Sequence, residues 1–156
     1  MTVKQLCDPA VIREILGENG FRFSKSKGQN FLIDPSVPTS IAQASGADTG
    51  VGVLEVGPGI GCLTAALAGL AEKVVSVELD TDLKPILPKT LQEYDNVEIV
   101  FGDVMKTDLR KLVEEKFAGL RPVVCANLPY NITTPVITAF LEAGCFEQIT
   151  VMIQRE

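Results

Sequence analysis

The chain has 156 residues, of which 46% are hydrophobic and 22% charged, a composition ordinary for one globular domain with its own core. It contains no histidine, which excludes Ser-His-Asp and Cys-His catalysis and most zinc chemistry. The net charge of −6 argues against a nucleic-acid-binding surface over the whole molecule, and neither a membrane-length apolar run nor a signal peptide is present.

The first third of the chain carries two helix signals. Asp8-Pro9 supplies an N-cap and a first-turn proline for a helix that ends near Gly17 or Gly20. Asp34-Pro35 repeats the signal for a second helix that ends near Gly46. Between them, residues 22–27 read Arg-Phe-Ser-Lys-Ser-Lys, a local basic patch whose alternative reading is a solvated loop.

Strand and helix patterns alternate over the rest of the chain. Five strands and their connecting helices predict right-handed crossovers and a parallel sheet. Pro85 and Pro88 interrupt the helical period of residues 81–94 and predict a kinked or late-starting helix there. We expect strands at 53–56, 74–77, 97–101, 123–126 and 149–153, and helices from the glycine-rich turn through Ala71, over 108–117, and from Thr134-Pro135 to Gly144.

The sequence stops directly after the last predicted strand. An exposed fifth strand would be an uncovered edge, so we expect further chain to follow. The four cysteines are Cys7, Cys62, Cys125 and Cys145. They are far apart in the sequence and form no Cys-x-x-Cys pair, which predicts reduced thiols in a cytoplasmic protein.

A glycine-rich turn follows the first predicted strand and reads Glu55-Val56-Gly57-Pro58-Gly59-Ile60-Gly61. Glycines at this place allow a tight turn and a close approach of a ligand to the backbone. A nicotinamide fingerprint requires Gly-x-Gly-x-x-Gly, whose last position would fall on Cys62. The turn instead fits the Glu-x-Gly-x-Gly-x-Gly form of S-adenosylmethionine enzymes, and a purely structural glycine turn is the alternative.

Acidic residues follow the next two predicted strands. Glu78 lies 21 residues after Gly57, close to the spacing of an acid that accepts hydrogen bonds from ribose hydroxyls. Asp80 and Asp82 are expected to cap the following helix. Asp103 is placed to reach a cofactor's adenine amino group. The alternatives are a surface acid for Glu78 and a capping residue for Asp103.

Asn127-Leu128-Pro129-Tyr130 follows the fourth predicted strand, at the sheet edge where open α/β folds bind ligands. An amide oxygen accepts a hydrogen bond from an amino group, and a tyrosine ring stacks on a base. The segment therefore suits a flat heterocycle held by its exocyclic amine. An ordinary turn is the alternative, and it loses weight because four consecutive strand ends carry fitting groups.

These segments resemble the ribosomal RNA adenine dimethyltransferase family of the bacterial small-subunit type. The resemblance covers roughly residues 22–156 and rests on Gly28-Gln29-Asn30-Phe31-Leu32, residues 55–61, Val77-Glu78-Leu79-Asp80, Gly102-Asp103 and the run from Asn127 to Pro135. It implies a Rossmann-like α/β methyltransferase with a five-stranded parallel sheet of order 3-2-1-4-5, helices on both faces and N-terminal helices before it. Residues 1–33 would form an N-terminal helix and basic loop that caps the cofactor site, and residues 34–156 an incomplete methyltransferase domain.

The resemblance also implies site residues and partners. The catalytic residues would be Asn127 and Tyr130, with Leu128, Pro129 and Tyr130 holding the target adenine of small-subunit ribosomal RNA. The protein would be a cytoplasmic monomer without a metal or a membrane partner. From its basic residues and its place just before Gly28, we hypothesise that the segment 22–27 meets RNA phosphates at the mouth of the site. S-adenosylmethionine would be held at positions that correspond to Asn30, Leu32, Gly57, Gly59, Glu78, Asp103 and Asn127.

Three other functions stay open from the sequence. The antibiotic-resistance methyltransferases that act on large-subunit RNA tend to carry Ile at the position of Leu128 and to lack the Gly57-Pro58-Gly59 form. A non-catalytic RNA- or ribosome-binding protein would use the same fold without turnover. A nicotinamide oxidoreductase is disfavoured by Cys62 and by the absence of histidine.

Overall fold

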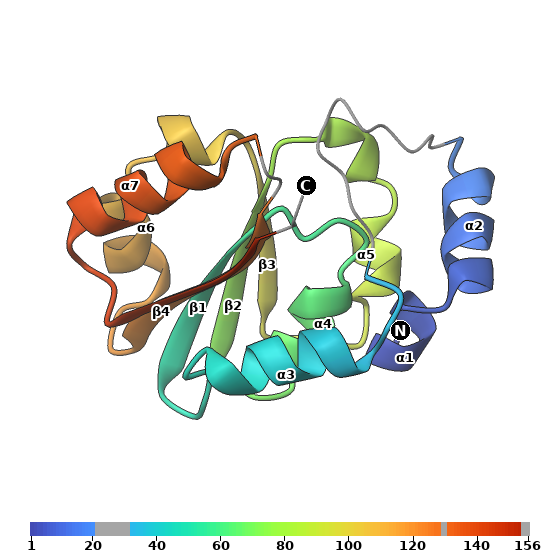
Figure 1. The fold of residues 1–156 in the computed structure, drawn as a ribbon, viewed down its shortest axis with the longest axis horizontal. Coiled ribbons are helices and arrows are strands. Elements are labelled where there is room, and N and C mark those ends of the chain that lie inside the picture. The colour runs from blue at the N-terminus through green and yellow to red at the C-terminus, as the bar shows by residue number, and fades with distance from the viewer. Residues whose placement is uncertain (21–31, 129–130, 154–156) are drawn as a thin grey trace.

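The computed structural model describes residues 1–20, 32–128 and 131–153 and contains one five-stranded parallel sheet (Figure 1). The strand order is β3-β2-β1-β4-β5, which confirms the expected order 3-2-1-4-5. Each predicted strand is present, and four of the five extend beyond the predicted bounds. The strands are β1 (Val51–Val56), β2 (Lys73–Glu78), β3 (Val97–Phe101), β4 (Arg121–Leu128) and β5 (Gln148–Ile153).

Seven α-helices and two 3₁₀ helices are found in the described residues. Asp8 caps α2 by accepting a hydrogen bond from the Ala10 amide at 2.9 Å, as its sequence predicts. Residues 81–94 form two short helices instead of one, because Pro85 and Pro88 interrupt the backbone hydrogen bonding. The helices are α1 (Val3–Leu6), α2 (Pro9–Glu18), α3 (Ser36–Ala44), α4 (Cys62–Ala68), η2 (Thr81–Leu83), α5 (Leu87–Thr90), η3 (Val104–Lys106), α6 (Leu109–Lys116) and α7 (Thr133–Ala143).

Helices cover both faces of the sheet, as expected (Figure 1). Successive residues of a strand point to opposite faces, so Val53 and Leu54 of β1 belong to different cores. One core contains Leu54 with Phe117 and Phe140, from the α6 and α7 side. The other contains Val53 with Leu63 and residues of α3 and α4. The sheet is thereby buried on both sides, which explains its near-continuous apolar strands.

A third core holds the N-terminal helices against the side of the sheet that carries β3. Leu6 of α1 and Ile12 and Leu16 of α2 pack in the same cluster as Ile60 and Leu87. The terminal ammonium group donates a hydrogen bond to the Thr90 carbonyl at 2.7 Å. Residues 1–18 are therefore fastened to α4 and α5. The proposed division at residue 33 stays a prediction, since residues 21–31 lie outside the described part.

The cysteines differ from the sequence prediction. Cys7 and Cys62 are 55 residues apart in the chain, yet their Cα atoms are 6.4 Å apart and the two residues form a disulfide. The prediction of four reduced thiols is therefore wrong for this pair. Sequence spacing hides the pairing because it depends on α1 packing against α4. Cys125 is buried and Cys145 half-buried, and both are free.

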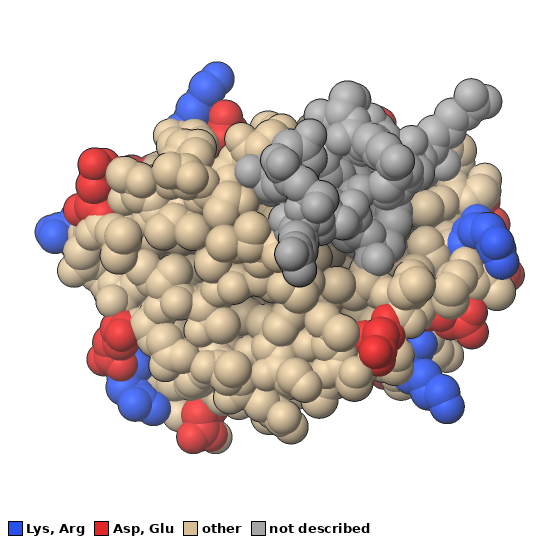
Figure 2. All heavy atoms as spheres, viewed as in Figure 1, with Lys and Arg blue, Asp and Glu red and all other residues tan. Residues whose placement is uncertain are grey.

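The face of the molecule in Figure 2 carries few charged side chains among the described residues. Acidic and basic side chains are intermixed around the margin of the face in Figure 2, and no basic patch gathers there among the described residues. The basic segment 22–27 lies outside them. No helix in the described ranges has the length and apolar character needed to cross a membrane.

Candidate active site at the carboxyl edge of the sheet

The polar residues predicted from the sequence lie at the carboxyl ends of parallel strands, either in the last residues of the strand or directly after it. Val56 of β1 is paired with Val77 of β2, and Glu78 is paired with Phe101 of β3. The Gly57 amide donates to the Val77 carbonyl at 2.9 Å, and the Gly102 amide donates to the Glu78 carbonyl at 2.8 Å. These bonds continue the sheet into the loops and bring the loops to one edge, where α/β folds bind ligands.

The glycine-rich turn has the backbone that its sequence predicts. Gly57, Gly59 and Gly61 have φ angles of 69°, 60° and 104°, in the region that side chains disfavour. A Cβ atom added to Gly57 would meet nothing within 4 Å, whereas one added to Gly61 would lie 2.8 Å from the Leu91 side chain. The turn is thus open at Gly57 and closely packed at Gly61.

Glu78 is fastened to this turn by hydrogen bonds. Its side chain is buried, with 7% exposed. One carboxylate oxygen accepts from the Gly59 amide at 3.3 Å, and the other accepts from the Asp80 amide at 2.9 Å. Burial raises the pKa of the Glu78 carboxyl, against the effect of these two backbone donors. The carboxylate therefore has a fixed position between β2 and the glycine-rich turn.

Glu55 is a second buried acid, and in the sequence it marks only the start of the glycine motif. It is 1% exposed and accepts hydrogen bonds from the hydroxyls of Thr64 and Ser76, the latter at 2.6 Å. Burial raises the pKa of its carboxyl to about 7. The signal in the sequence was a single acid inside an apolar strand, which requires buried partners.

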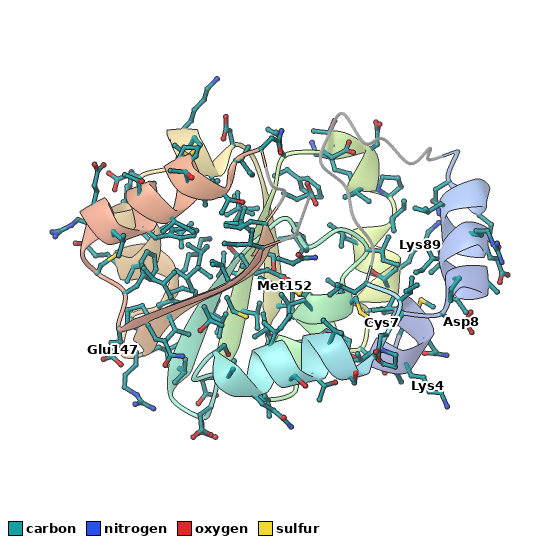
Figure 3. The ribbon with its side chains drawn as sticks, viewed as in Figure 1. Lys4, Cys7, Asp8, Lys89, Glu147 and Met152 are labelled. Atoms are coloured by element: carbon teal, nitrogen blue, oxygen red, sulfur yellow. A yellow bond between two sulfur atoms is a disulfide. The ribbon has the colours of Figure 1, made fainter. Side chains whose placement is uncertain are left out.

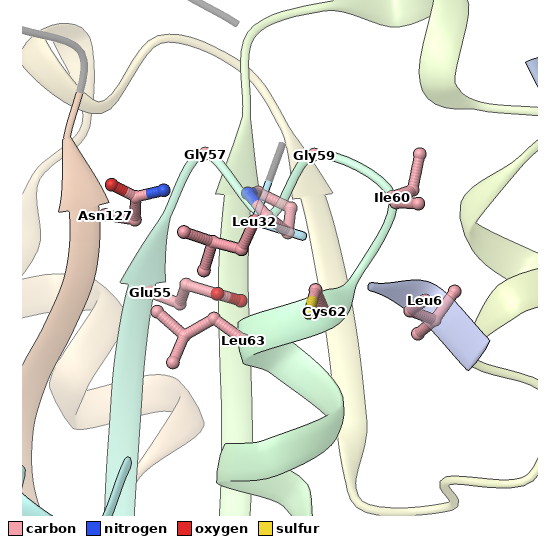
Figure 4. A pocket seen from close by; sticks show the side chains of 10 residues that line it. Leu6, Leu32, Glu55, Gly57, Gly59, Ile60, Cys62, Leu63 and Asn127 are labelled. Carbon is pink, nitrogen blue, oxygen red and sulfur yellow. The ribbon is translucent and has the colours of Figure 1, made fainter. Parts of the chain in front are cut away.

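A pocket lies between the glycine-rich turn, the start of α4, the end of β4 and the N-terminal segment (Figure 4). It brings together four residues predicted from the sequence, namely Leu32, Gly57, Gly59 and Asn127. Glu78 is not in the wall but is bonded to Gly59, which is. The remaining lining residues were not predicted and are Leu6, Glu55, Pro58, Ile60, Cys62 and Leu63.

Asp103 stands apart from this pocket. Its carboxylate accepts a hydrogen bond from the Met105 amide at 2.9 Å and so caps η3. This is the capping alternative considered from the sequence, and it leaves the second carboxylate oxygen to other partners. Asp80 caps η2 in the same manner by accepting from the Asp82 amide at 3.0 Å, as predicted.

The end of β4 has one buried and one half-buried residue. Leu128 is 1% exposed and belongs to the core on the α7 side. Asn127 is half-buried, and Figure 4 shows its amide beside Gly57. Within the described ranges the side-chain amide of Asn127 makes no hydrogen bond. The other predicted site residues, Asn30, Pro129 and Tyr130, lie outside the described part of the chain.

No group of three or more histidine, cysteine, aspartate or glutamate side chains in the described residues is placed to hold a metal ion. The groups that this edge presents are the buried carboxyls of Glu55 and Glu78, the open backbone at Gly57, and the side-chain amide of Asn127, which makes no hydrogen bond to the described residues. Such a set binds hydroxyl and amino groups through oxygen acceptors.

Comparison with known families identifies the chain. The sequence model of the family described as ribosomal RNA adenine dimethylase matches residues 20–156. The chain is 47% identical to the ribosomal RNA small subunit methyltransferase A of Alkaliphilus oremlandii over 97% of its length, and 47% identical to that of Bacillus pumilus over 98%. These matches cover 53% of each relative.

Two solved structures share the fold. The 23S rRNA methyltransferase ErmE matches with a TM-score of 0.69 and 32% identity, over 80% of this chain and 48% of that one. A dimethyladenosine transferase from Plasmodium falciparum matches with a TM-score of 0.63 and 29% identity, over 78% of this chain and 42% of that one. The chain spans about half the length of the curated relatives it matches. With the family match over nearly its whole length, the chain belongs to the ribosomal RNA adenine dimethylase family.

Proposed function

We propose that the protein transfers methyl groups from S-adenosylmethionine to the exocyclic amine of adenines in small-subunit ribosomal RNA and so forms dimethyladenosine. The observation that carries this proposal is the pocket in which the open glycine-rich turn and the uncommitted Asn127 amide meet. Family membership supports the reaction, and the similarity to small-subunit ribosomal RNA methyltransferases supports the small subunit as the substrate.

The residues present fit the cofactor. Gly57 leaves open space where a side chain would otherwise stand, so a ligand can approach the backbone amides. The Glu78 carboxylate is held in place for ribose hydroxyls, and the free oxygen of Asp103 is available to an adenine amino group. Leu79 and Met105 follow these two acids with 69% and 47% of their surface exposed, and they offer apolar contact to an adenine ring. When bound, S-adenosylmethionine supplies an electrophilic methyl group.

Asn127 is proposed to hold the acceptor amine. The lone pair of an adenine amine is conjugated into the ring, which makes it a weak nucleophile. The amide oxygen of Asn127 and the carbonyl of Leu128 would accept hydrogen bonds from the amine and favour a more pyramidal nitrogen. The same oxygen dipoles would stabilise positive charge as it develops on that nitrogen. Pro129 and Tyr130 are proposed, from the sequence, to complete the base pocket.

The protein lowers the reaction barrier mainly by aligning the amine nitrogen with the methyl group of the cofactor. In favourable intramolecular reactions alignment lowers the barrier by about 7–11 kcal/mol. Methyl transfer leaves a positive charge on the amine nitrogen, and this methylated ammonium is acidic enough to release a proton to water, so the chain needs no strong base. The absence of histidine is then compatible with the reaction. We further propose that the protein acts as a cytoplasmic monomer.

The second candidate function is methylation of large-subunit RNA. It is favoured by the structural match to ErmE, a 23S rRNA methyltransferase. The two candidates differ only in the RNA that enters the site, so the acceptor decides between them.

The experiment offers unmethylated small and large ribosomal subunits separately to the intact protein with radiolabelled S-adenosylmethionine. We expect label in adenines of the small subunit. Label confined to the large subunit would establish the second candidate, and label in neither would contradict both. An Asn127→Ala variant run in parallel serves as the blank for this pocket.

A further inference from the structure

We propose that Cys7 and Cys62 form a reversible dithiol–disulfide site whose oxidation state sets the affinity of the cofactor pocket. The inference rests on the proposed function only in taking S-adenosylmethionine as the ligand of that pocket. It starts from the disulfide that joins the two residues and from the position of Cys62 in the pocket wall.

The two cysteines come from segments that are remote in the sequence. Cys7 directly follows α1, and Cys62 is the first residue of α4, directly after the glycine-rich turn. Figure 3 places Cys7 between α1 and α4, and Figure 4 shows Cys62 beside Leu6. Their Cα separation of 6.4 Å lies within the range of about 4.4–6.8 Å that disulfides span. The fold therefore keeps the pair in bonding range before oxidation.

The bond connects two parts of one pocket wall. Leu6, at the end of α1 in the N-terminal segment 1–20, lines the pocket together with Cys62. Oxidation thus ties that segment to the helix that begins at the glycine-rich turn. After reduction the segment is held by the packing of its helices and by a few hydrogen bonds, such as that from Tyr94 to the Met1 carbonyl at 2.8 Å.

The direction of the effect follows from pre-organisation. A ligand that contacts both parts of the pocket wall binds only those molecules in which the two parts are in place. Its apparent affinity therefore falls in proportion to the fraction of such molecules. The disulfide removes those open states, so the oxidised protein binds the cofactor more tightly. By linkage, the bound cofactor must favour the disulfide over the dithiol by the same factor.

The chemistry is thiol–disulfide exchange with a small-molecule disulfide such as oxidised glutathione. The Cys62 thiolate attacks one sulfur of the oxidant, forms a mixed disulfide and releases one glutathione thiolate. Cys7 then attacks the Cys62 sulfur, the protein disulfide forms and a second glutathione leaves. Two protein thiols lose two electrons and two protons, and one glutathione disulfide becomes two thiols. Both cysteines are buried, but Cys62 is 6% exposed and lines the pocket, whereas Cys7 is 1% exposed, so Cys62 is the one that the oxidant reaches first.

The test measures two quantities on the intact protein, and neither is turnover. The first is the affinity for S-adenosylhomocysteine, which is the cofactor without its methyl group. Calorimetry measures this affinity in the fully oxidised and in the fully reduced wild type. We expect oxidation to tighten binding by about fivefold or more. The second is the glutathione redox ratio at which half of the Cys7–Cys62 peptide is linked, read by alkylation and mass spectrometry. Saturating S-adenosylhomocysteine should shift this ratio by the same factor.

Matched variants separate a switch from a structural bond. Cys7→Ser should bind with the affinity of the reduced wild type, and both Cys7→Ser and Cys62→Ser should bind with an affinity that does not change with the redox buffer. Cys145→Ser removes a half-buried free cysteine and should behave as the wild type. Loss of the loop closure should also lower the Tm by roughly 5–15 °C in either variant of the pair. The main comparison uses only the wild type in its two redox states. It therefore tests the proposal even if a cysteine variant fails to fold.

Equal affinity in the two redox states would overturn the proposal, as would the absence of a linked Cys7–Cys62 peptide in oxidising buffer. A linked peptide in a protein that binds no S-adenosylhomocysteine in either state would overturn the cofactor assignment itself and the coupling with it. These outcomes distinguish failure of the switch from failure of the proposed function.

Discussion

The two sides of the candidate site differ in how their polar groups are satisfied. On the side of β1 and β2, Glu55 and Glu78 are buried and each accepts two hydrogen bonds from the protein. On the side of β4, the Asn127 amide is half-buried and makes no hydrogen bond in the described residues. The carboxylates of the first side are satisfied by the chain itself, whereas the side-chain amide of the second side is open to a ligand. Substitutions on the second side should therefore affect chemistry and leave the fold intact, whereas those on the first side should change stability or cofactor binding.

The largest effect is expected from Asn127→Ala. Because the side chain has no internal hydrogen bond to lose, the Tm should stay close to that of the wild type. Loss of one oriented acceptor at the reacting nitrogen should lower methyl transfer by about 10²–10³-fold. Radiolabel incorporation into small ribosomal subunits, with thermal unfolding measured beside it, checks both parts.

Asn19→Ala is the matched control, since it removes an asparagine at the end of α2 that bonds to the Ile15 carbonyl. It should leave methyl transfer unchanged. Near-normal turnover by Asn127→Ala would remove this residue from the catalytic assignment and erase the contrast between the two sides.

Glu55→Gln tests the buried side through pH. The folded pKa of about 7 is above the unfolded value of 4.5, so neutral Glu55 contributes stability that is complete below about pH 4.5 and is lost as the pH rises through about 7. The cost of ionising this carboxyl in the fold is about 3 kcal/mol. Glutamine keeps the oxygen that accepts from Thr64 and Ser76 but cannot ionise. Relative to the wild type, the variant should gain that amount between pH 4.5 and 8.

Denaturant titrations across this pH range give the free energy of unfolding for both proteins. Glu114→Gln, which changes an exposed residue of α6, should follow the wild type. A constant difference between Glu55→Gln and the wild type would show that Glu55 does not titrate in this window.

Some of these residues could be predicted from the sequence, and others could not. The strands and the site edge were predictable because apolar runs, glycine turns and capping signals act locally. Gly57, Glu78 and Asn127 each lie at the carboxyl end of a strand, and parallel strands bring these ends to one edge. Glu55 as a buried site residue was not predicted, since its burial depends on hydroxyls that come from α4 and β2.

The remaining misses are tertiary in origin. The short helix α1 lacks the length for a periodic signal and is held by packing against α4. The Cys7–Cys62 disulfide depends on that same packing. The break within residues 81–94 was anticipated from Pro85 and Pro88, but its division into η2 and α5 was not, because prolines restrict the backbone without fixing where each turn closes.

Glu78→Ala should weaken the binding of the cofactor more than the binding of RNA. Hydrogen bonds to a charged group contribute about 1.5–3 kcal/mol, so cofactor affinity should fall by about 10–100-fold while RNA binding is preserved. Calorimetry with S-adenosylhomocysteine and a filter-binding assay with ribosomal RNA measure the two affinities. Glu114→Ala serves as the control for loss of an acid. Unchanged cofactor affinity would mean that Glu78 is only a structural link to Gly59.

The smallest effect, and the sharpest contrast, comes from a pair of glycines. Gly57 and Gly50 have φ angles of 69° and 79°, and a Cβ added to either meets nothing within 4 Å. Replacement by alanine should therefore destabilise the fold equally, by about 1–2 kcal/mol, as measured by denaturant unfolding. Gly50 lies in the turn before β1, away from the pocket, whereas Gly57 lines it. Only Gly57→Ala should weaken cofactor binding, by roughly fivefold or about 1 kcal/mol. Equal affinities in the two variants would show that the open space at Gly57 is not where the ligand approaches.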